Sequence, residues 1–311
     1  MLLLKGKEKS EILKQQQVSL RKQYFWGNQK FVAVLFFGKS NPSQVYVKLK
    51  EKYSNEIWLD FLIFGQNESN NSDFYHDLST YQLQDYKTKD SVISLINILN
   101  NDNRCIWIIC QLPLTDELKP YQQEICNAIS PLKDIDWLWD KLQNRAFEWK
   151  IDFLPATPQA VISLRNAYNL WDFTWKEVSV IWQSDIVWRP ISRYLQLHWA
   201  NVHTFDINNT PEEIASITKD SEIIISCTWA LHMINENFIK KDSSQIIIDV
   251  WYWFLNWKST WDIDFDKVSP YVKAISPVPW GVWPMTVANL FGNIFTIQSQ
   301  KEKIINLMNN L

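Results

Sequence analysis

A tyrosine and a lysine four positions apart are the first residues whose spacing suggests chemistry. The stretch 42–52 reads Pro-Ser-Gln-Val-Tyr-Val-Lys-Leu-Lys-Glu-Lys, so Tyr46 and Lys50 share one face if it is helical. A lysine that is removed from water has a lowered pKa and can transfer protons near neutral pH. The spacing alone is weak evidence, because a surface helix in a Lys-rich stretch shows it by chance. The elements around Tyr46 and Lys50 are needed to distinguish a catalytic pair from a solvated helix face.

Short apolar runs alternate with helical patterns on both sides of this pair. A polar stretch at 65–90 reads as a loop or a weakly ordered helix entry. The order strand, helix, strand, helix, strand predicts an α/β layer with a parallel sheet. The expected elements are an opening surface helix at 8–23, a strand at Phe31–Phe37, a helix from Asn41 to about Tyr53, a strand at Ile57–Phe64, a helix at Ser91–Leu99 and a strand at Cys105–Cys110.

A second α/β series follows a connector at 131–160 that is rich in Pro and Asp. Its rhythm is typical of a Rossmann-like nucleotide-binding domain. A further helix is expected from Pro284 to about residue 298. The expected elements of the series are strands at Val178–Ile181, Ala200–Phe205, Glu222–Ser226 and Gln245–Val250, and a helix at Trp188–Leu197.

The balance of tryptophan and glycine is unusual. The chain of 311 residues has 18 Trp and only 6 Gly. Glycine is therefore about 2% of the residues, against an average near 7%, and reading every Trp as Gly would bring it to about 8%. Several Trp also stand at turn positions, where Gly is favoured because it has no Cβ. Our hypothesis is that UGA codons were translated as Trp although the source organism reads them as Gly. A truly Trp-rich protein is the alternative.

With Trp read as Gly, residues 277–288 become Pro-Val-Pro-Gly-Gly-Val-Gly-Pro-Met-Thr-Val-Ala. This resembles a signature of the bifunctional methylenetetrahydrofolate dehydrogenase/cyclohydrolase family. Four more stretches resemble that family in the same order: Pro-Ser-Gln-Val-Tyr-x-x-x-Lys at 42–50, Trp-Ile-Ile-Cys-Gln-Leu-Pro-Leu at 107–114, Lys-Asp-Ile-Asp-Trp at 133–137 and Phe-Leu-Pro-Ala-Thr-Pro at 153–158. Cys110 and Ala156 depart from the family pattern. Short-chain dehydrogenases also use Y-x-x-x-K, but there it follows the nucleotide-binding turn, whereas here it precedes it.

The resemblance implies roles for individual residues. Lys50 would be the central catalytic residue, Gln111 would hold it by a hydrogen bond, Tyr46 would line the substrate site, and Asp136 would contact the pterin. We expect the folate substrate to meet Tyr46, Lys50, Gln111, Leu112, Pro113, Asp136, Pro277, Pro279, Trp280, Gly281, Val282 and Trp283. The expected domains are 1–150 for folate and catalysis, with 285–311 packing back on it, and 151–284 for NAD(P).

The turn between a strand and a helix at 178–190 is the expected cofactor site. With Trp as Gly it reads Gly-Gln-Ser-Asp-Ile-Val-Gly-Arg-Pro from residue 182, a pattern similar to the cofactor turn of this family, and a helix N-terminus there would offer N–H groups to phosphate. As written, the two Trp would fill the space that a pyrophosphate needs. Gln183 and the acidic Asp206 favour NAD slightly over NADP. The expected cofactor-binding residues are Trp182, Gln183, Ser184, Ile186, Val187, Trp188 and Asp206.

Charge and cysteine content exclude other classes. The net charge of −3 gives no basic footprint for nucleic acid, and the longest apolar runs are too short to span a bilayer. The four cysteines lack metal-ligand spacing and are expected to be reduced thiols of a cytoplasmic protein, so no metal is expected. The resemblance implies a homodimer.

The resemblance implies two reactions. The first is oxidation of 5,10-methylenetetrahydrofolate with NAD(P), and the second is hydrolysis of the methenyl product to 10-formyltetrahydrofolate, which supplies one-carbon units for purine biosynthesis. Two alternatives stay open. One is an inactive nucleotide- or folate-binding relative whose Trp residues are native. The other is a dehydrogenase of a different substrate, such as an amino acid, on the same domain plan, although the joint occurrence of Lys50, Gln111 and Asp136 argues against it.

Overall fold

The structure is a computed structural model, and it describes residues 1–25, 30–38, 41–65, 86–138, 154–170, 172–182, 188–228, 230–250, 253–255 and 258–309. The chain divides into two compact units. Residues 14–153 and 290–311 form one, which we call the Lys50 unit. Residues 1–13 and 154–289 form the other, which we call the six-stranded unit. The division falls within the two helices α1 (Lys7–Phe25) and α10 (Val282–Ser299).

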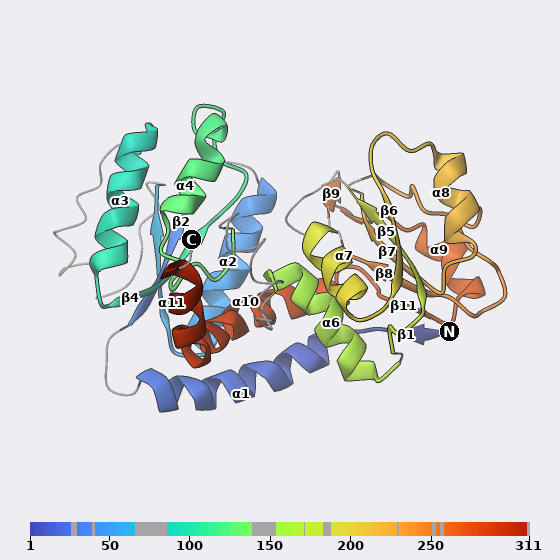
Figure 1. Cartoon of the computed structure of the whole chain (residues 1–311), viewed down its shortest axis with the longest axis horizontal. Coiled ribbons are helices and arrows are strands. Elements are labelled where there is room, and N and C mark those ends of the chain that lie inside the picture. The colour runs from blue at the N-terminus through green and yellow to red at the C-terminus, as the bar shows by residue number, and fades with distance from the viewer. Residues whose placement is uncertain are drawn as a thin grey trace. The chain divides into compact units, whose positions relative to one another are not determined.

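The Lys50 unit is built on a three-stranded parallel sheet in the order β3-β2-β4. Its strands are β2 (Phe31–Leu35), β3 (Asp60–Phe64) and β4 (Cys105–Cys110). All five side chains of β2 are buried, as expected for the central strand of a parallel sheet that is covered on both faces. The chain passes from β2 to β3 through α2 (Asn41–Glu56), and from β3 back across the sheet to β4 through α3 (Lys89–Asn101). Because such crossovers are right-handed and these two run in opposite directions, α2 and α3 lie on opposite faces of the sheet (Figure 1).

The six-stranded unit has a parallel sheet in the order β1-β11-β8-β7-β5-β6. The strand order reverses at β5, since the chain runs outward to β6 and then returns to β7. Helices α7 (Trp188–Leu197) and α8 (Pro211–Thr218) therefore cover opposite faces (Figure 1). Its strands are β1 (Leu2–Leu3), β5 (Glu177–Trp182), β6 (Asn201–Phe205), β7 (Ile223–Cys227), β8 (Ile246–Asp249) and β11 (Ala274–Ile275).

Shorter elements complete the described chain, and local sequence explains several of their ends. Thr210 and Glu213 form a capping box at the start of α8, and Pro211 occupies its first turn. Helix α6 ends at Asn169 in the left-handed conformation, which Asn tolerates better than most residues. The remaining elements are α4 (Gln122–Ala128), α6 (Ala156–Tyr168), α9 (Phe265–Val268), α11 (Lys301–Asn309), the hairpin of β9 (Trp253–Leu255) and β10 (Lys258–Thr260), and the 3-10 turns η2 (Lys119–Tyr121) and η3 (Ser269–Tyr271).

The predicted fold class is confirmed: two α/β parts, each with a parallel sheet and helices. The strand expected at Ile57–Phe64 begins later, at Asp60, because Trp58 adopts a left-handed turn with φ of 63°. Residues 1–13 group with the six-stranded unit, whereas the sequence placed them with 1–150, because Leu2 and Leu3 pair with Ala274 and Ile275. Across the described residues, every helix is too short or too polar to cross a bilayer.

Candidate active site

Lys50 is a buried lysine on α2 of the Lys50 unit. Its exposed fraction is 2%, which is rare for a lysine unless polar groups surround it. The helix places Tyr46 one turn earlier on the same face, and the ammonium nitrogen of Lys50 lies 4.7 Å from the centre of the Tyr46 ring. The predicted pair is therefore brought together by helix periodicity.

Gln111 meets Lys50 from the carboxyl end of β4. The backbone N–H of Gln111 donates to the carbonyl of Leu35, which extends the pairing of β2 with β4 by one step. The Lys50 Nζ donates to Gln111 Oε1 at 3.1 Å, and Gln111 Nε2 donates to the carbonyl of Leu112 at 2.8 Å. The side-chain amide is thus used at both ends, which orients its oxygen toward the lysine.

Asp136 is the third polar group around the lysine. Its Oδ2 lies 3.8 Å from the Lys50 Nζ, and its side chain is 19% exposed. It sits in a turn that follows an isolated parallel bridge between Ile108 of β4 and Asp134. The sheet therefore brings Gln111 and the turn of Asp136 to the same lysine.

Burial dominates the protonation of this cluster. It lowers the pKa of Lys50, and the nearby carboxylate of Asp136 opposes that change only in part. Burial likewise raises the pKa of Asp136 against the opposing effect of Lys50, and it raises the pKa of Tyr46, with the charge of Asp136 adding to the effect. Both members of the Lys50–Asp136 pair are thus shifted toward their neutral forms, and a neutral amine can accept a proton.

The predicted folate residues 277–283 belong to the six-stranded unit. The N–H of Gly281 donates to the carbonyl of Pro277 at 2.6 Å, and the N–H of Gly6 donates to the carbonyl of Trp280 at 2.7 Å. A Cβ at Gly281 would lie 2.8 Å from the Cβ of Ser276, so this turn leaves room only for glycine. Trp280 is half exposed, with the ammonium of Lys7 at 5.3 Å from its ring centre.

The remaining predicted folate residues lie in the same two regions, one around the start of α10 and one directly after β4. Pro277 and Pro279 are half-buried, Val282 is buried at the start of α10, and Trp283 follows it in the helix. Leu112 and Pro113 directly follow Gln111 and are joined by a cis peptide bond.

The predicted cofactor turn lies at the point where the strand order of the six-stranded sheet reverses. Ligands of open parallel sheets bind at that point, beyond the carboxyl ends of the strands. Trp182 ends β5 and Trp188 begins α7, while Gln183, Ser184, Ile186 and Val187 lie outside the described residues. Asp206 directly follows β6, beside β5, and its carboxylate accepts from the N–H of Asn208 at 2.8 Å.

Two buried aspartates that the sequence analysis did not identify anchor this edge. Asp262 Oδ2 accepts from the hydroxyl of Ser226 at 3.0 Å and from the N–H of Thr228. Asp249 Oδ2 accepts from the N–H of Ile263 at 3.0 Å. These bonds fix the carboxyl ends of β7 and β8. Asp249 stands at the end of the apolar run Ile246–Ile248, which was an available signal, whereas the sequence around Asp262 gives none.

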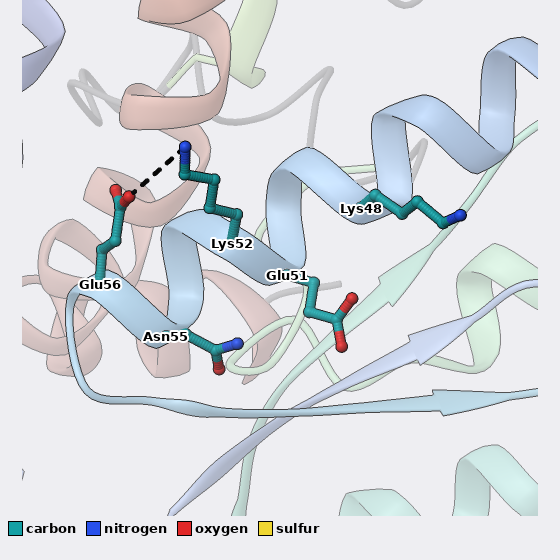
Figure 2. Close-up of a pocket in the computed structure, with 5 residues that line it drawn as sticks. All are labelled: Lys48, Glu51, Lys52, Asn55 and Glu56. Carbon is teal, nitrogen blue, oxygen red and sulfur yellow. Dashed lines mark ion pairs between the residues drawn. The ribbon is translucent and has the colours of Figure 1, made fainter. Parts of the chain in front are cut away.

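A surface depression on α2 is separate from the Lys50 cluster. Figure 2 shows its lining side chains, Lys48, Glu51, Lys52, Asn55 and Glu56. Lys52 lies 3.9 Å from Glu56, which also pairs with Lys14 at 2.6 Å. Exposed ion pairs of this kind contribute little to stability. The depression is the solvated face of α2, whereas Lys50 is on its buried side.

The fold and the buried lysine cluster define a two-part α/β protein with a Rossmann-like sheet. Comparison with known proteins identifies the class further. Residues 4–136 match the family model "Tetrahydrofolate dehydrogenase/cyclohydrolase, catalytic domain", and residues 155–302 match "Tetrahydrofolate dehydrogenase/cyclohydrolase, NAD(P)-binding domain". The chain belongs to the tetrahydrofolate dehydrogenase/cyclohydrolase family.

Individual relatives agree with the family assignment. The Bifunctional protein FolD of Mycoplasma mycoides subsp. mycoides SC is 33% identical over 304 residues, which cover 96% of each chain. That of Aquifex aeolicus is 31% identical over 278 residues, which cover 89% of this chain and 87% of the relative. The crystal structure of bifunctional FolD from Campylobacter jejuni is 30% identical, covers 97% of this chain and 99% of its own, and superposes with a TM-score of 0.81.

These matches confirm the predicted enzyme class. The chain is an NAD(P)-dependent methylenetetrahydrofolate dehydrogenase and methenyltetrahydrofolate cyclohydrolase of one-carbon metabolism. The order of the motifs, with Tyr46 and Lys50 ahead of the nucleotide-binding turn, is that of the matched domains.

Proposed function

We propose that Lys50 carries out the proton transfers of the cyclohydrolase step. The observation that carries this proposal is the burial of the Lys50 amine between Gln111 Oε1 at 3.1 Å and Asp136 Oδ2 at 3.8 Å. Burial lowers the pKa of Lys50, so a larger fraction of the amine is neutral than in water. Gln111 and Tyr46 orient the amine, because Gln111 Oε1 accepts a hydrogen bond from it and the centre of the Tyr46 ring lies 4.7 Å from its nitrogen.

The hydrolysis itself needs one base and one acid. A water oxygen bonds to the methenyl carbon of the cationic substrate, and the neutral Lys50 amine takes the proton that the water loses. The bond from that carbon to N5 then breaks as N5 receives a proton from the lysine ammonium. The hydroxyl on the carbon loses its proton to solvent, and the carbon remains on N10 as a formyl group. The net reaction consumes one water and releases one proton to solvent, and Lys50 returns to its starting form.

Asp136 is proposed to recognise the pterin. A carboxylate accepts hydrogen bonds from ring N–H groups, which gives specificity through paired donors and acceptors. The position of Asp136 next to Lys50 supports this role, since the ring and the reacting carbon belong to one substrate. Leu112, Pro113 and the segment Pro277, Pro279, Trp280, Gly281, Val282 and Trp283 are proposed to line the rest of the folate site.

The nicotinamide cofactor supplies a hydride acceptor for the dehydrogenase step. Its proposed binding residues are Trp182, Gln183, Ser184, Ile186, Val187, Trp188 and Asp206. The reversal of strand order at β5 and the start of α7 directly after the turn suit a dinucleotide, because a helix N-terminus favours phosphate. Asp206 at the end of β6 suits a ribose 2′-hydroxyl better than a 2′-phosphate, so we propose NAD as the slightly preferred cofactor over NADP.

Glycine is proposed at the positions where the printed sequence has tryptophan. Among the described residues, four Trp have positive φ: 63° at Trp58, 57° at Trp137, 61° at Trp175 and 62° at Trp199. This backbone region is uncommon for any residue other than Gly and is an outlier for bulky ones. The same substitution would open the cofactor turn, where Trp182 and Trp188 stand on either side. Codons decide the matter: UGG at most of these positions would refute the proposal.

The cellular setting is proposed from the resemblance. All four cysteines are free and buried, which supports a reducing cytoplasm, and the family resemblance supports a homodimer that serves purine biosynthesis. Light scattering on the purified chain gives the mass of the assembly. A monomer at micromolar concentration would rule the homodimer out.

The function is tested with the full-length chain in two forms, as printed and with all 18 Trp as Gly. Oxidation of methylenetetrahydrofolate is followed by absorbance with NAD and NADP in parallel. We expect the glycine form to turn over and its methenyl product to decay faster than without enzyme. A folded glycine form that is inactive with both cofactors would favour a binding protein or a dehydrogenase of another substrate.

A further inference from the structure

A buried asparagine on α10 contacts the turn that carries Asp136. Asn293 is 4% exposed, and its Nδ2 donates to the carbonyl of Ile135 at 2.9 Å across 158 positions of sequence. Both residues belong to the Lys50 unit. The Ile135 carbonyl is part of the peptide group whose nitrogen belongs to Asp136. Asn293 therefore holds the backbone from which the Asp136 side chain projects.

Two other contacts fix the same turn on either side. Asp134 is bridged to Ile108 of β4, and the N–H of Ile108 donates to the carbonyl of Lys133 at 2.8 Å. At the far end, the N–H of Leu138 donates to Asp134 Oδ2 at 2.7 Å. These contacts tie the ends of the turn to the sheet and to each other. The hydrogen bond from Asn293 reaches the middle of the turn, at the peptide group next to Asp136, the residue that faces Lys50.

Asn289 shows what an asparagine on this helix does without such a contact. It is 8% exposed and one turn earlier on α10, and its Nδ2 donates to the carbonyl of Met285 in the same helix at 2.8 Å. Its Oδ1 accepts from the hydroxyl of Ser163 at 2.9 Å. Asn289 thus satisfies its polar atoms on its own helix and on α6, within the six-stranded unit.

We infer that Asn293 is a positioning residue for folate recognition, acting through the Ile135 carbonyl to aim the carboxylate of Asp136 at the pterin. The inference rests on the proposed role of Asp136. A small displacement of a group that binds the substrate disturbs the geometry of the complex and weakens it sharply. Loss of the Asn293 amide should therefore weaken folate binding and leave cofactor binding intact.

The variant Asn293→Leu removes the amide donor and keeps the branched shape of the side chain. We expect KM for methylenetetrahydrofolate to rise about tenfold and KM for the nicotinamide cofactor to stay within twofold. The matched control is Asn289→Leu, the same change on the same helix, which should alter thermal stability and leave the folate KM near the wild-type value. Asn293→Ala removes the same donor without added bulk and gives the same comparison if Asn293→Leu does not fold.

A double-mutant cycle with Asp136→Asn separates positioning from packing. If Asn293 acts through Asp136, then Asn293→Leu raises the folate KM by less than twofold in the Asp136→Asn background. An equal effect in both backgrounds, or a lowered melting temperature with no change in folate KM, would overturn the inference. If Asp136→Asn itself leaves folate KM unchanged, the proposed role of Asp136 fails first, whatever Asn293→Leu does.

Discussion

The Nζ of Lys50 donates to Gln111 Oε1 at 3.1 Å, although the two residues are 61 positions apart. Helix α2 brings the lysine and strand β4 brings the glutamine, so the contact depends on the parallel pairing of β2 with β4. The acceptor is a neutral amide and not a carboxylate. It therefore orients the amine while leaving the pKa of Lys50 under the control of burial.

Replacing that neutral acceptor by a charged one should slow hydrolysis. In Gln111→Glu, a carboxylate at about the same distance favours the ammonium form and raises the pKa of Lys50 relative to wild type. We expect the cyclohydrolase rate to fall at least about tenfold at neutral pH and to recover as the pH is raised. The pH–rate profile of the methenyl substrate measures this, with Gln111→Met as the uncharged control. A pH–rate profile of Gln111→Glu that matches the wild-type profile would count against Lys50 as the base.

Burial of Lys50 should also appear in the pH dependence of stability. Its pKa is lowered in the folded state from the ordinary value of 10.5. At a pH between the folded-state pKa and 10.5, the unfolded chain holds a proton on Lys50 that the folded chain lacks. The contribution of Lys50 to the free energy of unfolding therefore rises with pH, by up to about 1.4 kcal/mol per pH unit. Lys50→Met removes that rise. Urea titrations of both chains from pH 7 to 10 compare the slopes, and parallel curves would show that Lys50 is not desolvated.

The left-handed tryptophans give a test that does not depend on activity. Trp175 has φ of 61° and is 69% exposed, so its side chain adds little packing. Trp175→Gly should be more stable than Trp175→Ala by about 1 kcal/mol, because alanine keeps the Cβ that opposes positive φ. Chemical denaturation of the two variants gives this difference directly. Equal stability, or a more stable alanine variant, would mean that residue 175 does not adopt this conformation in solution.

Cofactor choice should depend on Asp206. If its carboxylate accepts from a ribose hydroxyl, Asp206→Asn lowers kcat/KM with NAD about two- to tenfold and leaves NADP unchanged or improved. Asp220→Asn, which neutralises an exposed carboxylate in the same unit, is the control for net charge. Equal losses with the two cofactors would remove Asp206 from the cofactor site.

Local patterns predicted many elements well. The helix expected at Trp188–Leu197 and the strand expected at Cys105–Cys110 have those bounds in the structure. Both are marked by strong patterns, helical periodicity in one and a continuous apolar run in the other. The pairing of Tyr46 with Lys50 also follows from helix geometry alone, since four residues make about one turn.

Long-range partners could not be predicted in the same way. Strand β1 is only Leu2–Leu3, and its identity as a strand depends on pairing with Ala274 and Ile275. The spacing of Asn289 and Asn293 on an apolar helix is visible in sequence, but nothing local shows that one bonds within its helix and the other reaches Ile135. Such contacts are set by tertiary packing, which residue periodicity does not encode.

The most direct test of the account is Lys50→Met, measured against Lys48→Met on the exposed side of the same helix. Each variant is given the methenyl substrate, and its decay is followed by absorbance while folate binding is measured separately. We predict that Lys50→Met loses cyclohydrolase turnover and still binds folate, and that Lys48→Met behaves as the unaltered enzyme. Unchanged hydrolysis in Lys50→Met would contradict the assignment of Lys50 as the central catalytic residue.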